Sequence, residues 1–231
     1  MRLKRETIVE GALELLDEIG LDDFTTRRLA DRLGIQSPTL YWHFKSKGAL
    51  LEAMALAMLK DHDARPPPPP DVDWRNWFRE SAHSFRRALL SHRDGARVHA
   101  GTLPSPDQLP RTEAMMGLLR CAGFTPEEAF SILIALSRFV LGWVMEEQAA
   151  TDNGSIGWQG SLKLPSGQFP LLEEAARLTK DQSPDLGFDR AISFVLGLLQ
   201  PGHAVSVKES ERPQSPARTA HTTRKPRQSR S

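Results

Sequence analysis

Basic, hydroxyl and aromatic side chains gather between residues 27 and 47, and their types suit contact with DNA. Hydroxyl groups and cations bind phosphate oxygens, while longer polar side chains reach base edges in the major groove. The group consists of Arg27, Arg28, Thr39, Tyr41, Trp42, His43, Lys45 and Lys47. Two other interpretations stay open, because Tyr41 and Trp42 would also suit a packed core and the basic residues a solvated charged face. We predict a nucleic-acid-reading surface in this stretch.

Side chains able to transfer protons are present, but their arrangement does not favour catalysis. The chain has seven histidines and several pairs of adjacent glutamates, of which those at 127–128 and 146–147 are two. Adjacent residues on a helix point about 100° apart, so neither pair forms a catalytic dyad. The sequence also contains no GxSxG, HExxH, GxGxxG or P-loop motif. We predict that the protein is not an enzyme, with a helical enzyme and an interaction module without DNA binding as the less favoured alternatives.

The single cysteine, Cys121, excludes an internal disulfide and a CxxC metal or redox motif. This usage favours a reducing, cytoplasmic setting. Glu10 and Glu14 interrupt any apolar signal-peptide core near the N-terminus, so no export is expected. The most apolar stretch, residues 130–145, is too short to cross a bilayer and contains Arg138. We therefore expect a buried helix there and no membrane partner.

Hydrophobic periodicity and capping residues place the basic and aromatic group on short helices near the N-terminus. Gly20 and Gly34 supply helix stops, and Ser37 followed by Pro38 is a favoured N-cap and first turn. Either Thr25 or Thr26 can cap the second helix, and Ser46 can cap the fourth. The predicted helices cover residues 7–19, 25–33, 37–43 and 47–62. Two short helices that flank a turn at Gly34 are typical of a helix-turn-helix motif, whose second helix lies in the major groove.

The rest of the chain is also predicted to be helical. Residues 66–70 are all proline and cannot form a helix, so they separate the N-terminal part from the remainder. Further helices are predicted at residues 74–91, 94–98, 111–121, 126–148, 171–178 and 188–199. The helix at 126–148 is apolar nearly all round and needs burial on every side. With a polar, mobile loop at 151–169 and no convincing strand, the predicted fold class is all-α.

The net charge of +1 conceals a division between the body of the chain and its C-terminal tail. Seven basic and two acidic residues lie beyond residue 203, which leaves 23 basic against 27 acidic residues before it. Any DNA contact in the body must therefore come from a local cluster. The tail is predicted to be disordered, and it would either add a salt-sensitive grip on DNA or form a solvated extension without that role.

Two stretches carry a resemblance to a known family. Residues 25–51, TTRRLADRLGIQSPTLYWHFKSKGALL, resemble the DNA-binding domain of the tetracycline repressor family. Residues 84–102, SFRRALLSHRDGARVHAGT, resemble the regulatory core of tetracycline repressors, and Gly123, Phe124 and the run LGWVME at 141–146 keep matching spacing. The similarity covers most of residues 3–148. It implies a homodimer that binds double-stranded operator DNA and is released by a small-molecule inducer.

The resemblance and the helical pattern together imply a division of the chain. Residues 1–46 form the helix-turn-helix domain, 47–65 a connecting helix, 66–72 a proline-rich linker, 73–201 the ligand-binding and dimerisation domain, and 202–231 the disordered basic tail. The helices near 126–148 and 186–199 are expected to pair across a two-fold axis as a four-helix bundle. Two helix-turn-helix domains related by a two-fold axis require a palindromic operator. A resistance, efflux or antibiotic-biosynthesis gene is the implied target.

The resemblance also implies which residues face DNA. They are Arg27, Pro38, Thr39, Tyr41, Trp42, His43 and Lys47. Arg27 is implied to read guanine. The sequence departs at Ser37, where tetracycline repressors carry a base-reading glutamine just before the proline. We include Ser37 among the DNA-binding residues and expect an altered operator.

A metal-assisted ligand site is implied as well, because tetracycline reaches its repressors as a magnesium chelate. The resemblance makes His99 a direct Mg²⁺ ligand and Thr102 a water-mediated partner, with Glu146 of the partner subunit acting through other ligands. Imidazole nitrogen and carboxylate oxygen both serve Mg²⁺, which keeps several waters. On spacing alone, His99 would instead be an ordinary histidine hydrogen-bonded to a carbonyl.

The organic part of the implied ligand site differs more from the family. Asp63, Ser81 and Met115 stand where tetracycline repressors hold the polar edge of the drug with a histidine, an asparagine and a glutamine. Phe85 and Pro104 remain as apolar lining. Changing groups that hydrogen-bond a buried ligand costs orders of magnitude in affinity. We expect a metal-chelating or polycyclic effector related in shape to tetracycline, with a metal-free hydrophobic or polycyclic effector as the alternative.

Overall fold

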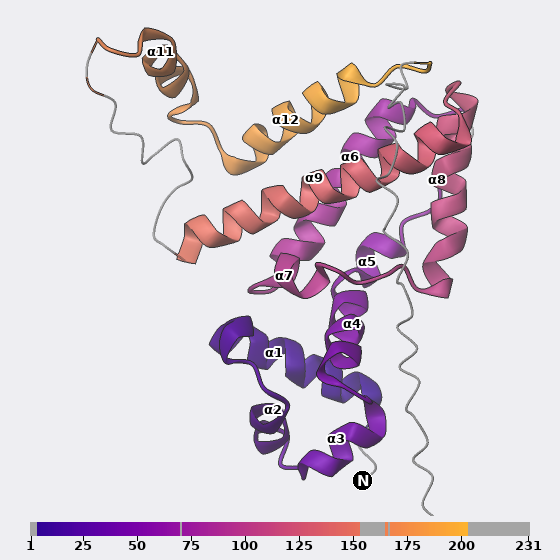
Figure 1. The fold of residues 1–231 in the computed structure, drawn as a ribbon, viewed down its shortest axis with the longest axis vertical. Helices are drawn as coiled ribbons and strands as arrows, with labels where there is room; N and C mark the ends of the chain where they lie inside the picture. The colour runs from indigo at the N-terminus through magenta and orange to yellow at the C-terminus, as the bar shows by residue number, and fades with distance from the viewer. Residues whose placement is uncertain (1–3, 70, 153–164, 166, 203–231) are drawn as a thin grey trace, which may run out of the picture.

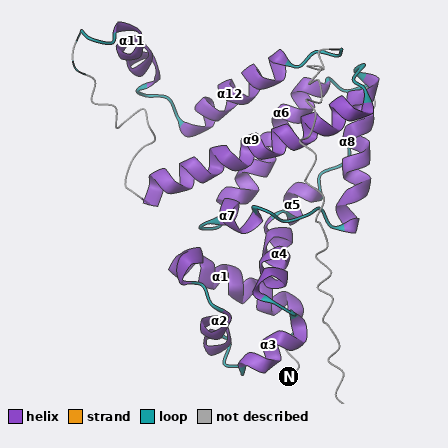
Figure 2. Cartoon of the chain, in the orientation of Figure 1, coloured by secondary structure: helices purple, strands orange, loops and turns teal. Residues whose placement is uncertain are grey.

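The computed structural model describes residues 4–69, 71–152, 165 and 167–202, and every regular element in them is a helix (Figure 1, Figure 2). This confirms the predicted all-α class. The elements are α1 (Arg5–Asp23), α2 (Thr26–Arg32), α3 (Ser37–His43), α4 (Lys47–Met58), α5 (Lys60–Asp63), α6 (Trp74–Leu90), α7 (Gly95–His99), the 3-10 turn η1 (Pro106–Gln108), α8 (Leu109–Cys121), α9 (Pro126–Asp152), α11 (Pro170–Thr179) and α12 (Pro184–Leu198). The predicted basic tail beyond residue 202 and most of the predicted 151–169 loop lie outside the described residues.

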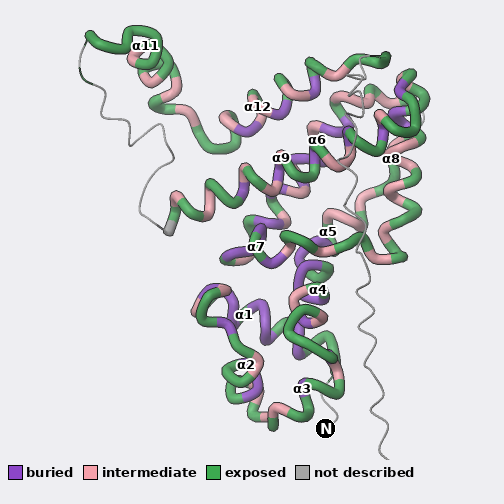
Figure 3. Tube along the Cα trace, viewed as in Figure 1, coloured by how far each residue is buried: buried purple, intermediate pink, exposed green. Residues whose placement is uncertain are grey.

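Helices α1 to α4 enclose the core of an N-terminal head, the lower group in Figure 3. Its fully buried side chains include Ile8, Leu16, Phe24, Leu29, Leu50 and Met54. Thr25 caps α2 by accepting a hydrogen bond from the Arg28 N–H (3.2 Å), and Ser46 caps α4 by accepting one from the Ala49 N–H (3.1 Å). Each such cap stabilises a helix by about 1 kcal/mol. The cap predicted at Ser46 is confirmed, and of the two candidates Thr25 and Thr26 it is Thr25 that caps α2.

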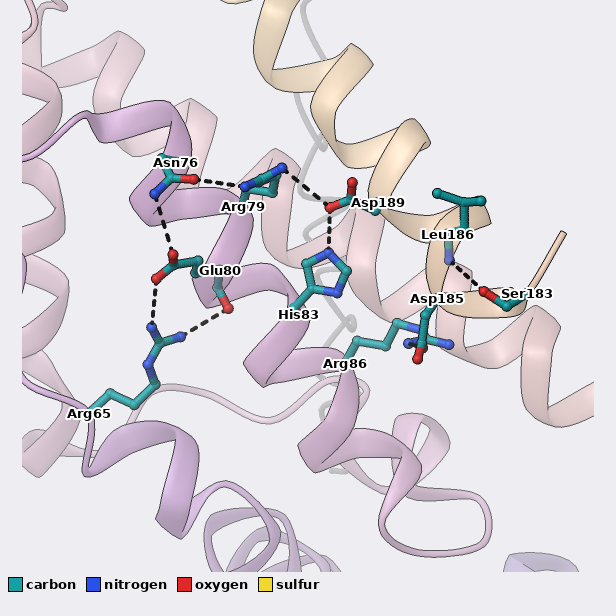
Figure 4. Close-up of polar contacts among 10 residues, drawn as sticks. All are labelled: Arg65, Asn76, Arg79, Glu80, His83, Arg86, Ser183, Asp185, Leu186 and Asp189. Atoms are coloured by element: carbon teal, nitrogen blue, oxygen red, sulfur yellow. Dashed lines mark hydrogen bonds and ion pairs between the residues drawn. The ribbon is translucent and has the colours of Figure 1, made fainter.

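Helices α6, α8, α9 and α12 pack around a second core. Its fully buried side chains include Leu89, Leu119, Phe124, Phe188, Ile192 and Leu196. Polar contacts join α12 to α6, with His83 Nε2 2.8 Å from Asp189 Oδ1 and Arg86 Nη1 2.5 Å from Asp185 Oδ1 (Figure 4). Arg86, 4% exposed, also donates two bonds of 2.8 Å to Glu147 of α9. Because a buried guanidinium is costly unless paired, this network holds α6, α9 and α12 in one arrangement.

The head and the core meet where α7 packs against α4, although α7 follows the proline run. Val98 of α7 is buried within the core of the head. Asp94, 8% exposed and at φ 56°, accepts hydrogen bonds from the Leu21 N–H (2.7 Å) and from Arg97 Nη1 (2.8 Å). Arg97 in turn pairs with Asp22 at 2.6 Å. The end of α1 is thus tied to the turn that begins α7.

Several predicted helix boundaries were wrong. Gln36 holds the cap position of α3 and Ser37 is its first residue, so Ser37 is not the N-cap. The predicted 47–62 helix is broken at Leu59 into α4 and α5. The break predicted at Gly20 is present, since this residue has non-helical backbone angles (φ 73°), but further helical residues follow it in α1 as far as Asp23. Residues 151 and 152 continue α9 and do not belong to the predicted loop.

Helix α9 is longer than predicted, and one of its faces is open within this chain. It was expected to need burial on every side and to pair with its copy across a two-fold axis, and in the single chain Phe130 is 54% exposed and Met145 is 41% exposed. The stretch was expected to be too short for a bilayer, whereas residues 126–151 form 26 helical residues that contain an 18-residue window of mean hydropathy 1.6, enough by length and composition to cross one. The core helix of a helical bundle has the same properties, and α9 packs against both α6 and α8. Its outer apolar face is left without a partner from the described part of this chain.

Candidate DNA-reading helix and ligand cavity

Helix α3 presents its aromatic side chains to solvent. Leu40 is 2% exposed and anchors the helix in the head, while Tyr41 is 52% and Trp42 87% exposed. A tryptophan ring that lies almost wholly in water contributes little to a core, so the core-packing interpretation of these two residues is wrong. Among the other predicted DNA-facing residues, the exposed ones are Arg27, Pro38, Thr39 and Lys47, and the half-buried ones are Ser37 and His43.

Some basic residues of the head are held by contacts within the chain. Arg32 pairs with Glu14 at 3.1 Å and with Glu18 at 2.6 Å. Lys47 Nζ donates to the carbonyl of Phe24 (2.8 Å) and lies 5.6 Å from the centre of its ring. Lys47 therefore joins α4 to the connection between α1 and α2, and its contact with DNA stays a prediction.

A ligand cavity of about 530 Å³ lies among helices α4 to α9 and the segment between α7 and α8. This volume falls within the range of small-molecule sites, about 300–1,000 Å³. Apolar side chains form much of the wall, from Ala55 and Leu56 of α4 to Leu136 and Val140 of α9. The cavity is therefore large and apolar enough for a ring system of several fused rings.

All seven residues predicted to bind the effector line this cavity. They are Asp63, Ser81, Phe85, His99, Thr102, Pro104 and Met115. Ser81 and Phe85 are four residues apart on α6, which places them on one face of the helix. Glu146 lies exposed on α9 and does not line the cavity of its own chain. Glu146 was expected to act at the ligand site of the partner subunit, and that role stays a prediction.

His99 and Thr102 form a polar corner of the cavity. The Thr102 hydroxyl lies 3.3 Å from His99 Nδ1 and donates to the carbonyl of His99 (2.9 Å). The Phe85 ring packs edge-on at 5.3 Å. Burial lowers the pKa of His99, and the attraction of Asp63 opposes this only in part. The neutral imidazole that results can offer a lone pair to a ligand or a metal.

Two polar residues of the cavity were not among the predicted ones. His62 and Arg111 both line it, and each has a buried nitrogen without a hydrogen-bond partner, Nδ1 and Nη2 respectively. The sequence contained a signal for Arg111, because it precedes Met115 by four residues on α8 and so shares its helix face. His62 directly precedes Asp63 and lies in the short helix α5, which follows the break at Leu59 that was not predicted.

The buried His62 should make the protein less stable in acid. Burial, followed by the charges of Arg111 and Arg65, lowers the pKa of His62 from 6.5 to about 4. Between these values the unfolded chain binds a proton that the folded chain does not, so stability falls as the pH falls through this window. The difference corresponds to at most about 3 kcal/mol, and we expect about 2 because the ring keeps some exposure.

A His62→Gln variant, which cannot ionise at this position, tests the point by urea unfolding at several pH values between 7 and 4. As the pH falls from 7 to 4, the free energy of unfolding should decrease by about 2 kcal/mol less in the variant than in the unaltered chain. His43→Gln, which replaces a histidine outside the cavity, is the control variant. Parallel curves for the unaltered chain and the His62 variant would contradict this expectation.

The donors of the cavity suit a metal that arrives with its ligand better than one held by the protein alone. Among the described residues, no three His, Cys, Asp or Glu side chains lie close enough to hold a metal ion. His99 and Thr102 offer one nitrogen and one hydroxyl at the same corner. Mg²⁺ commonly takes one or two protein ligands and completes its octahedron with waters and substrate oxygens. The residues present fit that kind of site.

An exposed helix-turn-helix reading helix, joined by packed helices to a cavity of drug-like size, defines a ligand-responsive DNA-binding protein. Comparison with known proteins agrees. Residues 8–54 match the model of bacterial regulatory proteins of the tetR family, and residues 66–202 match the tetracyclin repressor-like C-terminal domain. The chain belongs to the TetR family, and it is a ligand-responsive transcriptional repressor, not an enzyme.

Relatives with known names support this assignment. The chain is 42% identical over 200 residues to the tetracycline repressor protein class C of Escherichia coli, which covers 86% of this chain and 91% of that one. A variant of TetR from Acinetobacter baumannii AYE in complex with minocycline has a TM-score of 0.72 at 39% identity, covering 84% and 92%. TetR of class A with 5a,6-anhydrotetracycline and magnesium has a TM-score of 0.65 at 36% identity, covering 84% and 96%.

Proposed function

We propose that a homodimer of this chain represses transcription from a palindromic operator and leaves the DNA when a small molecule fills the cavity. The observation that carries the proposal is the double role of α7. His99 of α7 lines the cavity, while the neighbouring Val98 is buried in the core of the head. A ligand that binds one position of α7 better than another therefore shifts the head as well.

Dimer formation is supported by unpartnered apolar faces on α9 and α12. Phe194 and Leu198 of α12 are 69% and 65% exposed, and Phe130 of α9 is 54% exposed. Contiguous apolar surface of this kind marks an interaction site. Pairing the two helices with their copies would form the expected four-helix bundle and would set two reading helices on one duplex.

The division into a head at residues 1–46, a connecting helix at 47–65 and a ligand-binding and dimerisation domain at 73–201 is part of this proposal. In the head, Arg27, Thr39 and Trp42 make the base and phosphate contacts, and Ser37 gives an operator different from those of the named relatives. The protein acts in the cytoplasm, and its target is a resistance, efflux or antibiotic-biosynthesis gene.

The effector we propose is a polycyclic compound related in shape to the tetracyclines. Apolar walls suit fused rings, but Asp63, Ser81 and Met115 present one acceptor, one hydroxyl and one thioether to the polar edge. When bound with the effector, Mg²⁺ would supply positive charge for chelating oxygens. His99 and Thr102, with Glu146 of the partner subunit, are the residues that would hold it.

Operator release tests this function. The purified protein is incubated with the promoter next to its own gene, and gel shift is measured with and without candidate effectors. We expect binding to a palindrome and release by a polycyclic ligand. Failure to bind any duplex selected from a random-sequence pool would refute repression by this route.

Calorimetry with tetracycline, with and without MgCl₂, tests the class of effector. We expect weak binding, because the three polar replacements leave the polar groups of the drug without matched partners. Tight, magnesium-dependent binding would show that the replacements matter little and that tetracycline itself is the inducer. Binding that is tight without magnesium would favour the metal-free alternative.

A further inference from the structure

Arg111 brings a positive charge to the wall of the ligand cavity. It lies in the first turn of α8 and lines the cavity. Its Nη1 donates to the carbonyl of Arg65 (2.8 Å), and its Cζ lies 5.4 Å from the centre of the Trp77 ring. These two contacts hold the planar guanidinium in one orientation. The second terminal nitrogen, Nη2, is buried and has no hydrogen-bond partner.

The surroundings of Arg111 compensate its charge only in part. Asp63 attracts it, but one carboxylate oxygen of Asp63 accepts a hydrogen bond from Gln108 (2.7 Å), and Asp63 does not satisfy Nη2. Burial lowers the pKa of Arg111, the attraction of Asp63 opposes this, and the charge of Arg65 adds to the lowering. A buried cationic donor without a partner costs free energy, which a bound anion would recover.

His62 adds a second unpartnered group beside Arg111. Its Nδ1 is buried without a partner, and its ring lies 5.4 Å from the ring of Phe85. Arg111 donates to the carbonyl of Arg65, the Arg65 N–H donates to the carbonyl of His62 (3.4 Å), and both side chains line the cavity, so the two residues belong to the same part of its wall. A neutral imidazole can donate one hydrogen bond and accept another. One small oxygen-bearing group can therefore meet both residues.

On the basis of the function proposed above, we propose that the effector carries a carboxylate and that Arg111 binds it inside the cavity. Nη2 donates to one carboxylate oxygen, and His62 is placed to donate to the same group. A hydrogen bond between two charged groups is roughly twice as strong as one between neutral groups. The apolar wall, with Phe85, Leu136 and Val140, then holds the ring system. The ligand class is thus a polycyclic aromatic acid.

The test uses the full-length chain and pairs of ligands that differ in charge at one group. Naphthalene-2-carboxylate and anthraquinone-2-carboxylate are compared with their primary amides by calorimetry, with the thermal shift at millimolar ligand as a second readout. We expect the carboxylate of at least one pair to bind about tenfold more tightly than its amide. Carboxylates that bind no better than the amides, or that do not stabilise the chain at all, would overturn the proposal.

Variants locate the charge that is responsible. Arg111→Gln should abolish the preference for the acid, and Arg111→Lys should recover part of it. Arg87→Gln removes the same charge from an exposed residue of α6 outside the cavity and should leave the preference intact. A glutamine variant at position 111 that keeps the full preference would refute the role of Arg111. If that variant does not fold, the acid–amide comparison on the unaltered chain still decides.

Operator binding is measured in parallel, so that the two proposals fail separately. If the unaltered chain binds no operator, the proposed repression is wrong, while a measured preference for the acid would still describe the cavity. Operator binding that persists without any acid preference would overturn the role of Arg111 alone.

Discussion

Trp42→Ala should lower operator affinity about 100-fold and leave the fold intact. The ring is 87% exposed on α3, so its removal creates no cavity, and substitutions at such positions usually change stability by about 0.5 kcal/mol or less. A good contact to a base is worth about 1–3 kcal/mol. A loss of about 1.4 kcal/mol at each of two half-sites multiplies to about 100-fold. Fluorescence anisotropy with a duplex that the unaltered chain selects from a random pool measures the effect.

Leu171→Ala is the control for Trp42, since it truncates a side chain 80% exposed on α11, outside the head. Its operator affinity should match that of the unaltered chain. Both variants are also melted. A Trp42 variant with less than a threefold loss of affinity would show that this residue does not touch DNA. A large drop in its melting temperature would instead assign Trp42 a role in stability.

Most of the fold could be predicted from the sequence, because the information lies within single helices. The 3.6-residue spacing of apolar positions located the helices, and Thr25 and Ser46 marked two of their starts. The break at Gly20 was predicted, but the helical residues that follow it in α1 and the break at Leu59 were not. They depend on packing between α1, α4 and the turn that begins α7, which no local pattern contains.

The residues of the ligand cavity could also be predicted only in part. Its seven predicted residues came from resemblance, and the structure brings all of them together. His62 and Arg111 were missed because the family pattern used for the prediction contained no role for them. Their importance rests on burial of single nitrogen atoms, which depends on how α5, α6 and α8 approach one another. Helix spacing from Met115 could have drawn attention to Arg111.

The exposed α9 surface bears on a prediction that reached beyond the single chain. This apolar helix was expected to need burial on every side and to pair with its copy across a two-fold axis, and Phe130 and Met145 show that one of its faces is open within this chain. The rule of burial is sound, but it does not say which chain provides the cover. The homodimer that we propose would supply the second copy, with the open faces of α9 and α12 as the surface between the two chains.

Gly95→Ala should destabilise the folded chain by about 3 kcal/mol or more. A Cβ built at Gly95 would lie 2.1 Å from the carbonyl oxygen of Leu89, a backbone atom that cannot move without disturbing the end of α6. Overpacking of a well-packed site costs about 1–3 kcal/mol and sometimes more. The same Cβ would lie 3.4 Å from the sulfur of Met58 in α4, which is ordinary van der Waals contact, so the loss of stability comes from the backbone of Leu89. Urea unfolding measures the loss.

Gly117→Ala provides the matched control, because a Cβ at this position of α8 meets no atom within 4 Å. Alanine is the better helix former by about 1 kcal/mol, so this variant should be as stable as the unaltered chain or slightly more stable. The two alanine variants should therefore move in opposite directions. If Gly95→Ala unfolds at the same urea concentration as Gly117→Ala, α7 can shift away from α6 without cost. Such freedom would contradict the rigid α4–α7 link through which we expect the ligand to move the head.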